Sequence, residues 1–114
     1  KDYERVIEIL RNVEYEDIFY NINSKSILIK TYYESQQYDP LIYLLESFRA
    51  YINRNKNIPD SRKVLFKNLI RFTKKLANLP PGARAELKKL KAEVTDRKNT
   101  LNRSWLLEKI EELE

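Results

Sequence analysis

The sequence contains no cysteine, no histidine and no methionine, and only one glycine among its 114 residues. Without cysteine the chain forms no disulfide bond and has no thiolate nucleophile, which fits a cytoplasmic protein. Without histidine it lacks the side chain that most often serves as a general base or metal ligand. A glycine-rich phosphate loop needs several glycines, so a single glycine excludes one. These absences predict a protein that is not an enzyme and that uses no cofactor and no metal ion.

Long apolar runs are also missing, since none approaches the roughly 18 residues that a membrane-spanning helix needs. The chain has no signal-peptide pattern and begins with Lys1 rather than methionine, so we expect a piece of a longer protein. Hydrophobic residues make up 42% and charged residues 34% of the sequence, which is typical of a folded domain with its own core.

Apolar residues recur at steps of three and four, which predicts about six helices and no strand, and therefore an all-α fold. Asn21, Asn23 and Ser24 weaken the first half of the second helix. The first two predicted helices cover residues 2–13 and 16–35. The third is opened by Asp39-Pro40 and ended by "NRNKN", and the fourth runs from Asp60 or Ser61 to the break at "LPPG". The fifth carries Ala83 to Val94, and the last is capped by Asn102.

The first predicted helix has a counterpart one hairpin later in the chain. When "DYERVIEILRNV" (2–13) is placed over "QYDPLIYLLESF" (37–48), the apolar positions coincide at an offset of 35 residues. The matched pairs include Tyr3 with Tyr38, Val6 with Leu41, Ile9 with Leu44, Leu10 with Leu45 and Val13 with Phe48. A recurring helix-turn-helix unit of about 34 residues is typical of helical-repeat proteins. A chance match between amphipathic helices in a plain six-helix bundle is the alternative.

The stretch "TYYESQQYDPLIYLL" (31–45) resembles the inter-helix turn of the tetratricopeptide family, where an aromatic pair closes one helix and Tyr-Asp opens the next. The chain departs from the family at Ile29, Gln36, Leu41 and Phe48, where glycine or alanine is usual. The resemblance implies antiparallel helical hairpins stacked as a short right-handed solenoid, an α-α superhelix. The whole chain is also similar to the C-terminal part of uncharacterised bacterial repeat proteins that end in helices like "WLLEKI".

This resemblance implies a single helical-repeat domain over residues 1–114. Residues 1–55 are its tetratricopeptide-like part, residues 60–98 form a third, longer hairpin, and residues 102–114 form a capping helix. In the family, the first helix of each hairpin lines a concave surface that holds partner peptides. Carried onto this chain, the peptide-groove candidates are Asn23, Ser26, Lys30 and Tyr33. The alternative is ordinary helix surface, with Tyr33 packed on the next helix.

Positive charge is concentrated in the middle of the sequence. Residues 49–75 contain nine basic residues and one acidic residue, whereas residues 1–48 contain five basic and nine acidic residues. The basic-face candidates are Arg62, Lys63, Lys67, Arg71, Lys74 and Lys75. This face is interpreted as a solvated surface, as a surface for an acidic protein partner, or as a surface for nucleic acid or an anionic membrane. Phe66 and Phe72 fall on the apolar stripe, which argues against base stacking.

The sequence therefore predicts a protein-interaction scaffold with a protein or peptide partner. If the partner binds the basic face, we expect it to be acidic. Binding of nucleic acid or an anionic surface through the fourth predicted helix is the first alternative. A purely structural role as the C-terminal end of a larger protein is the second. In that case the N-terminal hairpin would be uncovered, and isolated chains would self-associate through it.

Overall fold

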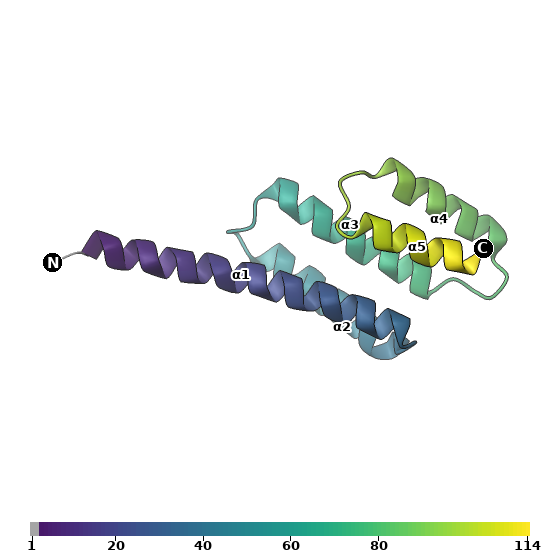
Figure 1. Ribbon diagram of the computed structural model, residues 1–114, viewed down its shortest axis with the longest axis horizontal. Helices are drawn as coiled ribbons and strands as arrows, with labels where there is room; N and C mark the ends of the chain where they lie inside the picture. The colour runs from purple at the N-terminus through teal and green to yellow at the C-terminus, as the bar shows by residue number, and fades with distance from the viewer. Residues whose placement is uncertain (1–2) are drawn as a thin grey trace. The chain divides into compact units, whose positions relative to one another are not determined.

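The computed structural model describes residues 3–114 and contains five α-helices joined by short connections (Figure 1). Within the first helix, the side chains of residue 4 and of residues 6–16 lie outside the description. The helices are α1 (Tyr3–Glu34), α2 (Tyr38–Arg54), α3 (Asp60–Ala77), α4 (Arg84–Asp96) and α5 (Arg103–Leu113). Residues 3–114 contain no strand, so the all-α class is confirmed, and five helices come close to the predicted six. The chain forms two compact units, Lys1–Gln37 and Tyr38–Glu114.

In the first unit, α1 is one continuous helix of 32 residues, so the predicted break between Val13 and Glu16 is wrong. The segment contains neither proline nor glycine, the two residues that most strongly interrupt a helix. Asn21 is accommodated within the helix, because its Nδ2 donates a hydrogen bond of 3.0 Å to the carbonyl of Asp17, one turn earlier. The apolar stripe predicted for the start of the chain lies outside the described side chains; its members are Val6, Ile9, Leu10 and Val13.

The first unit ends in a turn in which Gln36 has a left-handed backbone, with φ of 59°. The amide of Gln37 donates to the carbonyl of Tyr32 over 2.8 Å, and the amide of Gln36 donates to that of Tyr33 over 3.1 Å. This pair of bonds is the Schellman motif, which terminates a helix and usually has glycine at the left-handed residue. The turn predicted between the aromatic pair and Tyr38-Asp39 is therefore present, and it is built with glutamine at a position that favours glycine.

In the second unit, α3 is the central helix and contacts α2, α4 and α5 (Figure 1). The sequence predicts one apolar stripe on this helix, but α3 is buried more widely because it has three neighbours. Phe66 and Phe72 are buried as the sequence predicts, and Leu69, Ile70, Thr73 and Leu76 are buried with them. On α2 the buried residues are Leu41, Leu45, Phe48 and Ile52, which recur at steps of three and four. The rings of Phe48 and Phe66 stack with centroids 6.3 Å apart, joining α2 to α3.

The predicted break at "LPPG" separates α3 from α4. The amide of Ala83 donates to the carbonyl of Pro80 over 3.2 Å, which closes the turn before α4. Gly82 has φ of 78°, a conformation that side chains disfavour, so glycine suits this position. The two helices contact each other.

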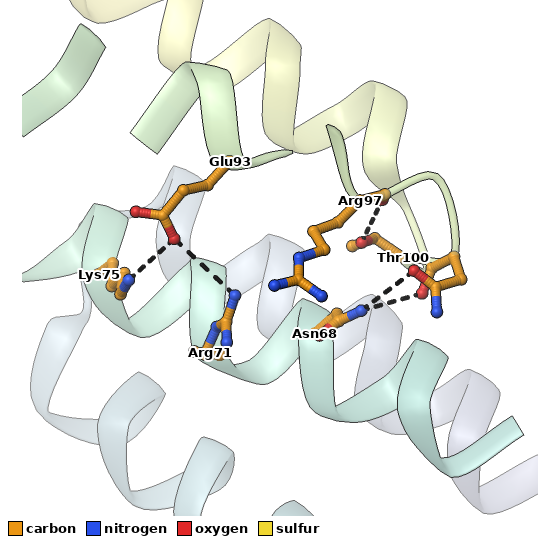
Figure 2. A network of polar contacts seen from close by, with 7 residues as sticks. Asn68, Arg71, Lys75, Glu93, Arg97 and Thr100 are labelled. Atoms are coloured by element: carbon orange, nitrogen blue, oxygen red, sulfur yellow. Dashed lines mark hydrogen bonds and ion pairs between the residues drawn. The ribbon is translucent and has the colours of Figure 1, made fainter. Parts of the chain in front are cut away.

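The connection between α4 and α5 is attached to the middle of α3. The amide of Leu101 donates to the carbonyl of Leu65 over 3.2 Å, and Asn68 Nδ2 donates to the carbonyl of Asn99 over 3.2 Å (Figure 2). Asn102 precedes α5 as predicted, but its side chain makes no capping bond and its backbone is left-handed, with φ of 56°. The predicted side-chain cap is therefore wrong, although the boundary is right. α5 packs on both α4 and α3.

Candidate binding groove

A groove with a volume of about 730 Å³ lies along α3 and α4 in the second unit. We call it the α3–α4 groove. Its α2 and α3 lining consists of Arg49, Lys67, Asn68, Ile70, Arg71, Lys74 and Lys75. The turn and α4 contribute Asn78, Leu79, Pro80, Glu86, Lys89, Leu90 and Glu93. Ile70 and Leu90 are buried and Leu79 is half-buried, so the groove combines an apolar floor with charged edges.

The charge of the groove is strongly positive. Six of its lining residues are lysine or arginine and two are glutamate, which gives a formal net charge of +4. This balance follows from the sequence of α3, where Lys67, Arg71 and Lys74 or Lys75 recur about one helical turn apart and so share one face. Apolar side chains between them point into the core, and the cations are left along the edge of the groove.

Glu93 on α4 sits opposite two cations of α3 (Figure 2). Lys75 Nζ donates a hydrogen bond of 3.0 Å to Glu93 Oε2, and Arg71 Nη2 lies 3.8 Å from the same oxygen. The bond from Lys75, assisted by the nearby positive charges, holds the pKa of Glu93 below its ordinary value of 4.5. The Glu93 side chain is 28% exposed, whereas its two partners are about half exposed. One carboxylate thus links the two walls of the groove.

Three of the six cations are not ion-paired among the described residues, although the charge of Lys89 helps to lower the pKa of Glu93. Arg49, Lys67 and Lys89 make neither a hydrogen bond nor an ion pair there. Lys74 is only weakly engaged, since its Nζ lies 4.0 Å from the carboxylate of Glu46 and both side chains are largely exposed. The groove therefore offers positive charge that its own carboxylates do not neutralise.

The basic face predicted from the sequence is divided by the structure. Lys67, Arg71, Lys74 and Lys75 line the groove, whereas Arg62 and Lys63 do not. Sequence reasoning missed Arg49 as a member of the groove, and it missed the α4 residues Lys89 and Glu93 entirely. The run "ELKKLKAEV" (86–94) signals a charged helix, but no local pattern shows which of its faces meets α3.

The peptide-groove candidates all lie on α1, in the first unit, and recur at steps that place them on one side of the helix. Asn23 is exposed, and Lys30 and Tyr33 are half-buried. Ser26 is buried, and its hydroxyl has no hydrogen-bond partner among the described residues. Ser26 is therefore poorly placed to contact a peptide from solvent. The other three residues stay candidates by prediction only.

Aromatic side chains are absent from the lining of the α3–α4 groove. Phe66 and Phe72, which the sequence places on the apolar stripe, are buried in the core as predicted. Within the part of the chain that the structure describes, no three acidic side chains gather as metal ligands would. None of the described helices is both long enough and apolar enough to cross a membrane.

In comparison with known proteins, the chain matches no family model, no curated protein and no solved structure.

Proposed function

We propose that the chain is a protein-interaction module whose α3–α4 groove binds an acidic, amphipathic segment of a partner protein. The observation that carries this proposal is the set of unpaired cations, Arg49, Lys67 and Lys89, at the edges of an apolar floor. Apolar side chains of the segment would cover Ile70 and Leu90, and its carboxylates would pair with the cations. A helix laid into a groove is a common way for one protein to recognise another.

The walls of the groove are formed before any partner binds. α3 and α4 are regular helices joined by the Lys75–Glu93 ion pair, and the α4–α5 connection is bonded to α3 through Leu65 and Asn68. A preformed surface loses little conformational freedom on binding, so more of the contact energy contributes to affinity. This supports a passive scaffold that presents a fixed surface.

Nucleic acid is the second candidate, because a groove with a net charge of +4 would also attract phosphate. Proteins that hold single strands add aromatic side chains on which bases stack. The groove has none, and the two phenylalanines of α3 are buried. An apolar floor without an aromatic platform favours a polypeptide over a nucleic acid.

The proposal is tested with a synthetic helical probe that has leucine at three- and four-residue spacing and glutamate at the flanking positions. Fluorescence anisotropy of the labelled probe measures its affinity for the full chain. We expect binding that Lys67→Glu with Lys89→Glu weakens at least about tenfold, because each reversal replaces an attraction with a repulsion.

The matched control is Arg62→Glu with Lys88→Glu, which makes the same charge change on the same two helices outside the groove. It should leave affinity within about twofold, since only distant, screened charges change. A probe with lysine in place of glutamate should not bind. Equal loss of affinity in both double variants would show that net charge, rather than the groove, attracts the probe, and would overturn the proposal.

A mixed-sequence single-stranded oligonucleotide is titrated across a series of salt concentrations with the same proteins. Binding tighter than that of the acidic probe, with a steep salt dependence abolished by the groove variant, would establish the nucleic-acid alternative. No oligonucleotide binding at low salt, together with probe binding, would support the polypeptide partner.

A further inference from the structure

One face of α1 carries large apolar side chains exposed to solvent. Tyr20 is 73% exposed and Ile27 is 64% exposed, and they lie seven residues apart. Phe19 and Leu28 beside them are also exposed. Scattered apolar side chains are common on surfaces, but a helical row of them marks an interaction surface.

Tyr20 and Ile27 belong to a row that has the spacing of a coiled-coil seam. Alternating steps of three and four residues connect six positions: Asp17, Tyr20, Ser24, Ile27, Thr31 and Glu34. Such steps place all six along one stripe of the helix. Tyr20 and Ile27 are its apolar members, Ser24 and Thr31 are small polar residues beside them, an acid stands at each end, and no position carries a cation. We call this the α1 seam.

The α1 seam and the α3–α4 groove have complementary chemistry. The seam presents Tyr20 and Ile27 between two carboxylates, and the groove presents an apolar floor between cations that make no ion pair among the described residues. We propose that the α1 seam of one copy of the chain occupies the α3–α4 groove of a second copy. This inference rests on the proposed function, because it names an amphipathic segment with a carboxylate at each end as the one that the groove takes.

Charge favours this occupant over a second α1. If two seams paired in parallel, Asp17 would face Asp17 and Glu34 would face Glu34. If they paired antiparallel about the centre of the stripe, Asp17 would face Glu34. Both arrangements bring carboxylates together, which is unfavourable. In the groove the same carboxylates meet Arg49, Lys67 and Lys89, which make no ion pair among the described residues.

Seam and groove are different surfaces, so each copy has both halves of the contact. An association of this kind is heterologous and continues from copy to copy until it closes into a ring or runs on as a chain. We therefore expect assembly that grows with protein concentration, and that high salt weakens at least about tenfold because salt screens the charge pairs.

Two variants separate the halves of the contact. The groove variant, Lys67→Glu with Lys89→Glu, keeps the seam intact. The seam variant, Tyr20→Lys with Ile27→Lys, keeps the groove intact, and both substituted side chains are exposed, so folding should persist. Analytical ultracentrifugation should show the wild-type chain associating and each variant alone as a monomer. An equimolar mixture should form a heterodimer, because one intact seam then meets one intact groove and growth stops there.

The matched control is Tyr43→Lys with Val64→Lys, which adds the same charge at exposed apolar positions outside the seam. It should associate like the wild type. The inference is overturned if the wild type is monomeric at every concentration, if the mixture of variants stays monomeric, or if the groove variant still associates, which would indicate seam-to-seam pairing. A monomeric wild type that binds the acidic probe in its groove would overturn this inference alone. A chain that neither associates nor binds the probe would overturn the proposed function as well.

Discussion

Arg103, in the first turn of α5, donates a hydrogen bond of 3.1 Å from Nε to the carbonyl of Val94 in the last turn of α4. Its Nη2 donates a second bond of 2.7 Å to the carbonyl of Thr95. A cation near the start of its own helix is unfavourable for the helix dipole, but here it satisfies carbonyls at the end of another helix. One side chain therefore joins two helices and terminates the first of them.

Replacing this side chain should loosen the α4–α5 pair. We expect Arg103→Ala to lower the free energy of unfolding by about 2 kcal/mol, because two charge-assisted bonds are lost, one of them to the part-buried carbonyl of Val94. Arg103→Lys should lose less stability than Arg103→Ala but remain less stable than the wild type, since an ammonium cannot donate in the same forked geometry. Urea denaturation followed by circular dichroism measures the change. The exposed Arg97→Ala is the control, and an equal loss there would argue against a specific role for Arg103.

A buried hydroxyl group in α3 that has no hydrogen-bond partner predicts a stabilising substitution. Thr73 is fully buried, and its Oγ1 has no hydrogen-bond partner among the described residues. Valine has nearly the same shape without the hydroxyl, so Thr73→Val should raise the free energy of unfolding by about 1 kcal/mol. Thermal unfolding measures it. Thr95→Val is the control, because Thr95 Oγ1 is exposed and donates to the carbonyl of Lys91 over 2.7 Å. A fall in stability for Thr73→Val would mean that the hydroxyl is satisfied.

Backbone strain predicts a second stabilising substitution, at the end of α1. Gln36 has φ of 59°, where a side chain costs about 1 kcal/mol relative to glycine. Gln36→Gly should therefore stabilise the turn, although part of the gain is lost because glycine is more flexible in the unfolded chain. Helix content and thermal unfolding by circular dichroism measure the effect. Gln37→Gly, at a residue without positive φ, should be neutral or destabilising. If Gln37→Gly were more stable than Gln36→Gly, backbone strain at Gln36 would be contradicted.

These examples show where sequence reasoning succeeds and where it fails in this chain. The starts of α2 and α3 are predicted well, because Asp39-Pro40 and Asp60 are local signals that act within one helical turn. Within α1, the expected weakening at Asn21 is not observed, because Asn21 bonds back to the carbonyl of Asp17 in its own helix. Local polarity does not reveal whether a side chain will find a partner one turn away.

The groove was predicted only in part, because packing between helices decides which residues of α4 line it. Four of its cations follow from the spacing on α3, but Lys89 and Glu93 come from a helix whose orientation depends on packing. Leu87, Leu90 and Val94 are buried on α4. They direct one face of that helix into the core, and Lys89 and Glu93 flank this face. Only the assembled core identifies which charges meet across the hairpin.

The lowered pKa of Glu93 predicts a pH dependence of stability. Because the pKa is lower in the folded chain than its ordinary value of 4.5, the ion pair stabilises the fold above that pH. Its contribution disappears as the pH falls through the lowered pKa. Glu93→Gln should therefore reduce stability by about 0.5 kcal/mol at neutral pH, since its partners are half exposed, and by less in acid. Unfolding of both proteins across an acidic pH series measures this. A difference that grows in acid would have the wrong sign and contradict the assignment.

Glu93 also competes with any acidic partner for Arg71 and Lys75, so its removal should strengthen binding to the groove. Glu93→Gln frees both cations and raises the net charge of the groove by one, and we expect the acidic helical probe to bind about threefold more tightly. Asp96→Asn makes the same charge change at an exposed position of α4 outside the groove, and it should have a smaller effect because salt screens distant charges. Fluorescence anisotropy at moderate ionic strength compares the two variants with the wild type. Weaker binding by Glu93→Gln would show that the carboxylate matters for holding the groove walls more than it competes for their cations. Equal gains in both variants would mean that the probe responds to the overall charge of the protein and does not occupy the space beside Glu93.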